Sequence, residues 1–355
     1  MAVKFTKPEI NVREKLAELD KPSGIAGEAM LRAETPQEQQ ALIGVGRRNL
    51  LINGGFDVWQ RNGTSVVDSA DGPYNYITAD RWVTYYKGTY AQIEDTLPTG
   101  KIVKTMRYTV GSSGNAPNFN QPVENGGKIM AGQTVTMSWW MKASKSANIN
   151  SRLPNTASGV FAGGSSAYNL TVTPIGTHPV TAEWTYHTET KTFPSTMSHT
   201  NVHFELWGDN AEWSASDTFQ MANCQLEFGK VATPFEHRSY GEELALCQRY
   251  YFKVGGAGNG NTTNIITGGV EGSGGAAVGG LAFPTTMRAV PTISTANLNF
   301  WAYTGGGSSF TVGTNRCTKE VGAFVVGGIS NRVGGQAGVC YKINDNGYLA
   351  FDAEL

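Results

Sequence analysis

The stretch Cys224–Phe252, CQLEFGKVATPFEHRSYGEELALCQRYYF, decides how the chain is organised. A strand-like run ends at Leu226–Phe228, and a connection rich in glycine and proline follows at Gly229–Pro234. Tyr240–Arg249 then has the residues of a short helix, with its apolar side chains on one face. This order predicts the end of one β-rich unit and a linking helix that opens a second unit.

The segment before this stretch contains runs in which apolar and polar residues alternate. Thr134–Met141 reads TVTMSWWM and Asn201–Gly208 reads NVHFELWG, so each predicts a strand with one apolar face. Asn49–Phe56 predicts a further strand that runs into a glycine turn. Because no helical pattern separates such runs, residues 49–238 predict a jelly-roll β-sandwich of antiparallel sheets.

The segment after the linking helix contains short strand-like runs, such as Thr292–Ala296, Gly338–Ile343 and Leu349–Ala353. Residues 239–355 therefore predict a second, C-terminal β-sandwich. The predicted fold class is mainly β, with helices confined to the linking helix and to the N-terminal residues.

Residues 1–48 differ from the rest because they contain short helical patterns and few aromatic residues. Val12, Leu16 and Leu19 have helical spacing, and Asn11 is a candidate N-cap. These helices are too short and too poor in apolar residues to build a core alone. We therefore expect an arm that anchors the protein by packing on a partner.

Composition excludes several classes of protein. The chain has 355 residues, of which 40% are hydrophobic, 10% aromatic and 16% charged, and its net charge is −1. The aromatic content argues against disorder, and the balanced charge argues against binding to nucleic acid. No apolar run is long enough to insert into a membrane, and the four cysteines lack the spacing of a zinc or redox site.

Several local motifs resemble known families. Asn49–Arg61, NLLINGGFDVWQR, with Ala79–Trp82, ADRW, and the closing run Phe219–Glu227, resembles jelly-roll domains built like carbohydrate-binding modules. Glu243–Tyr251, ELALCQRYY, resembles the C-terminal β-domain of bacteriophage tail proteins, as do two later segments, FPTTMRAVP at 283–291 and DAEL at 352–355. The N-terminal segments resemble those of phage fibres.

This resemblance implies a non-enzymatic virion protein, a tail fibre whose distal C-terminal domain faces the host and binds a cell-surface glycan. It would assemble in the host bacterial cytoplasm as a homotrimer and bind a phage tail or capsid protein through residues 1–48. A head fibre or capsid-decorating protein with the same architecture is the structural alternative, and a glycan depolymerase is the less favoured enzymatic one. No cofactor, nucleic acid or membrane partner is implied.

Aromatic residues are the main candidates for a binding site. Adjacent strand residues face opposite ways, so if one of Trp139 and Trp140 is in the core, the other is outside it. The candidates are Trp140, Trp207, Trp213, Trp301 and Tyr303. Such side chains suit either the apolar faces of sugar rings or packing against a neighbouring subunit or module.

The sequence offers no catalytic pattern. The acidic residues of the first unit, Glu183, Glu189, Glu205, Asp209, Glu212 and Asp217, show no spacing of a glycosidase pair and are expected on solvated sheet faces. His199 and His203 are about 13 Å apart along a strand, too far for one metal ion, and are also expected on a solvated face. Asp57, Asp80 and Asp217 could supply oxygen to a structural calcium ion.

Overall fold

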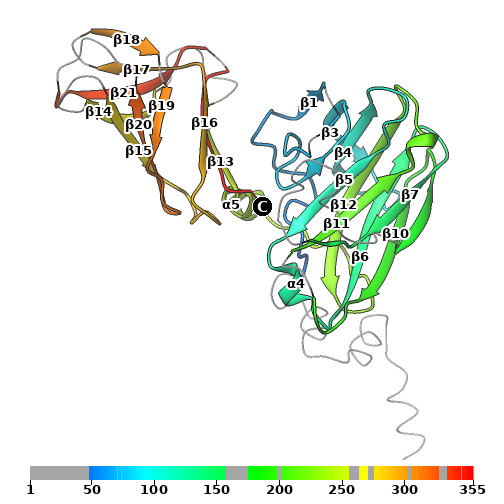
Figure 1. Ribbon diagram of the computed structural model, residues 1–355. Coiled ribbons are helices and arrows are strands. Elements are labelled where there is room, and N and C mark those ends of the chain that lie inside the picture. The colour runs from blue at the N-terminus through cyan, green and yellow to red at the C-terminus, as the bar shows by residue number, and fades with distance from the viewer. Residues whose placement is uncertain are drawn as a thin grey trace, which may run out of the picture.

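The computed structural model describes residues 48–69, 71–72, 74–156, 175–197, 201–255, 264–270, 276–302, 305–309, 311–327, 334–344 and 346–354 (Figure 1). These residues form two β-units joined by one helix. The predicted N-terminal arm, including Val12, Leu16 and Leu19, lies outside the described residues.

The first unit consists of two antiparallel sheets. Sheet A has the order β1 (Ser65–Asp68), β3 (Gly88–Thr96), β4 (Ile102–Val110), β12 (Thr218–Phe228), β6 (Thr134–Ala143) and β10 (Thr185–Thr192). Sheet B has the order β2 (Val83–Thr84), β5 (Asn118–Val123), β11 (Asn201–Gly208), β7 (Ala147–Arg152) and β9 (Gly176–Val180), with β8 (Asn155–Thr156) also paired to β11. Consecutive strands mostly alternate between the sheets, as in a jelly roll.

The core of the first unit lies between these sheets. The alternate residues Val135, Met137, Trp139 and Met141 of β6 are all fully buried, which confirms the predicted apolar face of Thr134–Met141. Trp139 meets Phe204 of sheet B edge to face, with ring centroids 6.2 Å apart. The predicted jelly-roll sandwich is thus confirmed.

The prediction of a strand at Asn49–Phe56 is wrong. The segment is an irregular loop. The backbone amides of Asn49, Leu51, Ile52 and Asn53 donate to side chains instead of to a partner strand. The Asn49 side-chain oxygen accepts from the amides of Leu51 and Leu226, and Gln121 Oε1 accepts from the amide of Ile52. The loop passes so close to β12 that a Cβ on Gly54 would lie 2.1 Å from the Cys224 carbonyl oxygen. The motif therefore encodes a tightly packed loop.

Helix α5 (Tyr240–Gln248) confirms the predicted linking helix. Ser239 caps it, and the Ser239 side chain and the Glu242 side chain complete a reciprocal capping box. Two further short helices in the described residues, α4 (Gly126–Ile129) and the 3-10 turn η1 (Asn210–Glu212), lie in loops of the first unit. No helix in the described ranges is long and apolar enough to cross a membrane.

The second unit also consists of two antiparallel sheets, and confirms the predicted C-terminal sandwich. Sheet C has the order β13 (Tyr251–Gly255), β22 (Tyr348–Asp352) and β16 (Thr292–Ala296). Sheet D has the order β18 (Gly305–Ser309), β17 (Leu298–Ala302), β21 (Ala337–Lys342), β14 (Asn264–Val270), β15 (Ala277–Ala282), β20 (Val321–Gly327) and β19 (Thr311–Asn315). Phe300, Phe324 and Phe351 are central to a shared core.

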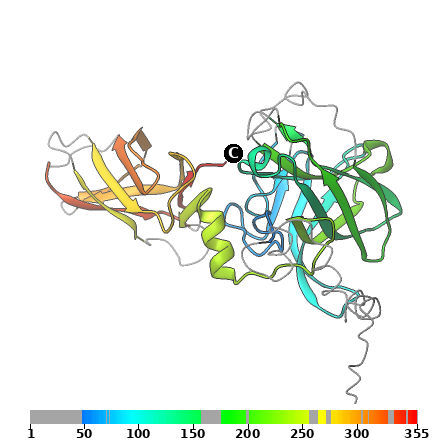
Figure 2. The same cartoon turned by 90° about the horizontal axis from the view of Figure 1, so that it is seen from below.

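Charged side chains tie the two units together. Glu354, near the C-terminus, pairs with Arg61 and Arg81 of the first unit, and Asp352 pairs with Arg61 at 2.7 Å. Glu124 of the first unit also pairs with Arg249, the residue that follows α5, at 3.1 Å. Figure 2 shows that α5 and the C-terminus both lie between the two units.

Candidate functional site

The outer face of sheet B carries a set of polar side chains in register. Glu205 of β11 lies opposite Asn120 of β5 on one side and Arg152 of β7 on the other. Paired residues of neighbouring strands share a face, and Phe204 and Leu206 point into the core, so this row points outward. We call the polar face the set Asn118, Asn120, Arg152, His203, Glu205 and Trp207.

The expectation that His203 and Glu205 lie on a solvated face is wrong. His203 is fully buried and Glu205 is only 1% exposed. The physical reason is that β11 lies inside sheet B and its outward side chains are packed among polar neighbours, which include Arg152. By contrast, β10 at the edge of sheet A alternates between exposed and half-buried residues, as a solvated strand does.

Several buried atoms of the polar face have no hydrogen-bond partner in the described part of the chain. Both amide atoms of Asn120 are unpaired, as is Oδ1 of Asn118. Arg152 Nε and Glu205 Oε2 are 3.6 Å apart, which is too far for a hydrogen bond. Each buried polar group without a partner lowers the stability of the fold by about 1–3 kcal/mol, so these unpaired atoms destabilise the protein.

Trp207 stands at the open side of the polar face. Its ring lies under the Arg152 guanidinium, 4.2 Å from the ring centroid, and both side chains are partly exposed. Trp207 pairs in the strand register with the half-buried Asn150 of β7, which in turn pairs with the exposed Thr177 of β9. The polar face therefore reaches solvent through an aromatic ring and an amide.

Burial controls the charge of this face. It lowers the pKa of the His203 imidazole to about 3, and the Arg81 guanidinium acts in the same direction. Burial also raises the pKa of the Glu205 carboxyl, against the opposing effect of Arg152 and a hydrogen bond from Asn118. His203 is therefore neutral at neutral pH.

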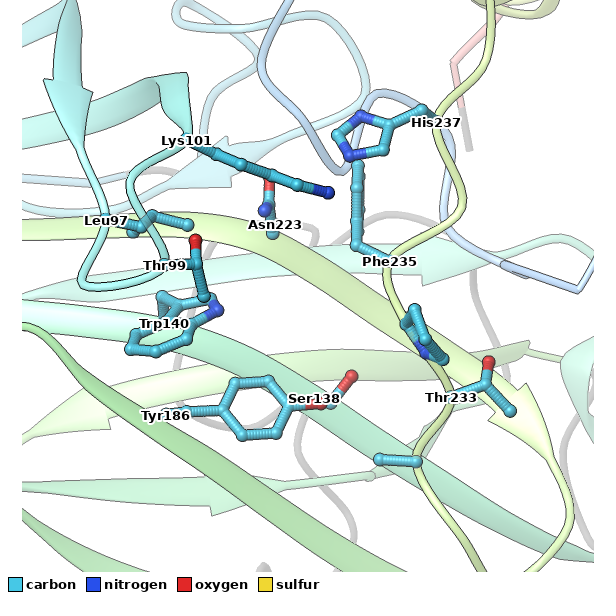
Figure 3. A pocket seen from close by; sticks show the side chains of 12 residues that line it. Leu97, Thr99, Lys101, Ser138, Trp140, Tyr186, Asn223, Thr233, Phe235 and His237 are labelled. Carbon is cyan, nitrogen blue, oxygen red and sulfur yellow. The ribbon is translucent and has the colours of Figure 1, made fainter. Parts of the chain in front are cut away.

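Trp140 lies on the opposite side of the sandwich, on the outer face of sheet A. Its ring borders an open hollow of about 350 Å³, which Figure 3 shows from close by. Tyr186 of β10 lies directly across from it in the strand register. The structure therefore separates Trp140 and Trp207, because the two residues belong to different sheets and face away from the common core.

The other predicted aromatic candidates have different surroundings. Trp213 is not an exposed platform: it is 2% exposed and packs edge to face on Phe219, because the turn that follows η1 folds its ring into the core. Trp301 is 42% exposed on β17 of the second unit. Tyr303 lies outside the described residues.

The three carboxylates predicted to hold calcium have separate partners. Asp57 pairs with Lys104 at 3.1 Å, and Asp217 pairs with Lys145 at 3.4 Å. Asp80 is buried and accepts hydrogen bonds from Gln60, and burial raises the pKa of its carboxyl to about 7. Across the described ranges no three His, Cys, Asp or Glu side chains gather as metal ligands do.

Of known protein families, curated proteins and solved structures, only solved structures are similar to this chain. No known family matches the sequence, and no curated protein matches it. A CBM4 carbohydrate-binding module is 19% identical, with a TM-score of 0.30 over 50% of this chain and 98% of that one. The CBM22-1–CBM22-2 tandem domain of Xyn10C from Paenibacillus barcinonensis is 10% identical, with a TM-score of 0.32 over 87% and 98%.

A viral structure is also similar. The enzymatically active domain of tailspike protein 4 from bacteriophage CBA120 is 12% identical, with a TM-score of 0.33 over 51% of this chain and 21% of that one.

Sequence reasoning identified Trp207 and Trp140 but missed most of their neighbours. Asn118 and Asn120 alternate with Phe119 in the run Asn118–Val123, which is a strand signal with a polar outer face. That signal was present in the sequence. The placement of Arg152 beside Glu205 depends on strand order, which no local pattern encodes.

Proposed function

We propose that the protein binds saccharides and that the polar face is a binding site. The observation that carries this proposal is the row Asn120–Glu205–Arg152 next to the partly exposed ring of Trp207. Within the described residues, both amide atoms of Asn120, Glu205 Oε2 and Arg152 Nε have no hydrogen-bond partner. Sugar hydroxyls both donate and accept hydrogen bonds, and the C–H faces of sugar rings pack on aromatic rings. The unpaired atoms are themselves buried, so a sugar that packs on Trp207 would have to enter the polar face to supply both kinds of contact.

Binding without hydrolysis fits this face better than catalysis. The polar face has a single carboxylate, Glu205, whereas a glycosidase ordinarily uses a pair of carboxyl groups about 5–9 Å apart. Purified protein incubated with host polysaccharide should release no reducing ends. Release of reducing ends would show that the protein is a depolymerase.

The test of the polar face is Trp207→Ala, with affinity electrophoresis against extracellular polysaccharides and a glycan array as the measurements. We expect at least tenfold weaker binding, because the variant loses the aromatic ring beside the buried polar row. Tyr240→Ala is the control, since it removes an exposed aromatic ring from α5, outside the polar face. Equal binding by Trp207→Ala and the wild type would refute the proposed site.

We further propose that the protein is part of a phage particle, as a tail fibre whose arm binds the virion and whose distal second unit faces the host. The motif resemblances at both ends of the chain support this proposal. Trimerisation would bring several weak sites to one surface and raise their effective concentration. A head fibre or capsid-decorating protein is the alternative location.

Immunogold labelling of intact virions with an antibody against residues 239–355 tests the location. Label on the tail is expected, and label on the capsid would contradict the tail-fibre proposal. Mass measurement in solution tests the trimer, for which a mass of three chains is expected. A monomer that still binds virions would contradict it.

A further inference from the structure

The hollow on the outer face of sheet A has features of a second binding site. It is bordered by three aromatic rings, those of Trp140, Tyr186 and Phe235, and holds a volume of about 350 Å³. Figure 3 shows Tyr186 and Trp140 on one side and Phe235 and His237 on the other. Its walls come from sheet A, the β3–β4 turn and the segment that follows β12.

The aromatic pair on this face is not required for the main core. Trp140 and Tyr186 are paired residues of β6 and β10, and their ring centroids are 5.2 Å apart at 44°. Tyr186 is 45% exposed, while Trp139 on the other face of β6 fills the core. The two tilted rings therefore present apolar surface to solvent, which suits a flat ring with C–H groups.

A strand irregularity places an amide in the same hollow. The register of β12 shifts between Ala222 and Gln225, and Asn223 within this bulge has a φ of 49°, in the left-handed region. Bulges re-aim side chains and are frequent beside binding sites. The Asn223 amide has no hydrogen-bond partner within the described residues, and its side chain lines the hollow. It is thus available to a ligand.

The charge of the lining is of one sign. Apart from the Tyr186 phenol, the ionisable side chains of the lining are Lys101 and His237. Lys101 is exposed and forms no ion pair in the described part of the chain, and Figure 3 shows its amino group extending over the hollow. A ligand with a negative charge would form an ion pair with this ammonium group, whereas beside a neutral sugar the group would stay hydrated and form no ion pair.

We propose that this hollow binds an anionic sugar residue, whose ring packs on Trp140 and Tyr186 and whose acidic group meets Lys101. The amide oxygen of Asn223 would accept hydrogen bonds from the sugar hydroxyl groups, and its NH₂ group would donate to them. The hollow is on sheet A and the polar face is on sheet B, so the two sites do not share residues. One chain would then contact a polysaccharide at two places, which strengthens attachment by avidity.

Isothermal titration of the full chain tests this proposal with three oligosaccharide probes of equal length: a uronate, a sulfated and a neutral oligosaccharide. We expect the uronate or the sulfated probe to bind, and to bind less tightly at higher salt. The uronate and sulfated arms distinguish a carboxylate from a sulfate as the acidic group. Failure of both anionic probes to bind would overturn the proposal.

Two variants with matched controls place the binding. Lys101→Ala and Tyr186→Ala should each weaken binding of the anionic probe about tenfold. Lys128→Ala removes the same charge from α4, and Tyr240→Ala removes an exposed tyrosine from α5, so both should bind as the wild type does. Thermal unfolding of each variant verifies its fold, and Lys101 is exposed, so its replacement leaves the sandwich intact.

Trp207→Ala separates this proposal from the one for the polar face. If the hollow binds the anionic probe, Trp207→Ala retains that binding, whether or not the polar face binds sugars. Binding that is lost in Trp207→Ala but unchanged in Lys101→Ala and Tyr186→Ala would overturn the proposal for the hollow.

Discussion

Replacing Glu354 by glutamine would test how strongly the two units are held together. The Glu354 carboxylate is 5% exposed and pairs with Arg61 at 2.9 Å through one oxygen and with Arg81 through the other. Glutamine has nearly the same shape but no charge, and its amide group is a donor. One of the two guanidinium groups would then face an NH₂ group in place of a carboxylate oxygen.

The loss falls mainly on Arg81. Arg61 keeps Asp352 at 2.7 Å, whereas the described residues offer Arg81 no other carboxylate. Removing one partner of a buried ion pair costs about 3–5 kcal/mol. Arg81 retains a hydrogen bond to the Pro122 carbonyl at 2.9 Å and the Tyr250 ring at 3.6 Å. We therefore expect the lower end, about 3 kcal/mol.

Urea unfolding followed by circular dichroism measures this change. With an m value of about 3 kcal/mol per M, a loss of 3 kcal/mol lowers the midpoint by about 1 M. Glu320→Gln is the control, because Glu320 is exposed in the same unit, and it should change stability by less than about 0.5 kcal/mol. If Glu354→Gln unfolds at the same urea concentration as Glu320→Gln, the ion pairs do not stabilise the junction.

Two further predictions concern the first unit and α5. Gly54→Ala should destabilise the protein by at least about 2 kcal/mol, because its Cβ would lie 2.1 Å from the Cys224 carbonyl oxygen. The control Gly241→Ala in α5 places its Cβ near no other atom and should be neutral or slightly stabilising. Thermal unfolding measures both variants, and equal midpoints would contradict the prediction. Burial lowers the pKa of the His178 imidazole from 6.5 to about 4, although the Glu189 carboxylate is 3.5 Å away. The neutral His178 therefore contributes its full stability above pH 6.5, and this contribution is lost as the pH falls towards 4. The stability difference between the wild type and His178→Gln should fall by about 2–3 kcal/mol from pH 7 to pH 4 in urea titrations, and a difference that does not vary with pH would show that His178 is not buried as a neutral group.

The sequence by itself determined the mainly β fold, the linking helix and the apolar faces of strands such as β6 and β11. These features follow from local periodicity and capping, which depend on residues a few positions apart. The sequence also identified the tryptophans from which both candidate sites were found. The prediction of a strand at Asn49–Phe56 is wrong because backbone amides of this segment donate to side chains such as those of Glu236 and Gln121, which only the fold brings near.

Only the tertiary structure decided what surrounds those tryptophans. In the tertiary structure Trp213 is buried, and Trp140 and Trp207 lie on the outer faces of opposite sheets of the first unit. The fold placed Arg152 beside Glu205, and Lys101 beside Tyr186, through strand order and loop position. These neighbours are distant in sequence, and an alternation of polar residues predicts a face but not what packs on it. The chemistry of both sites therefore depends on how the sheets pair.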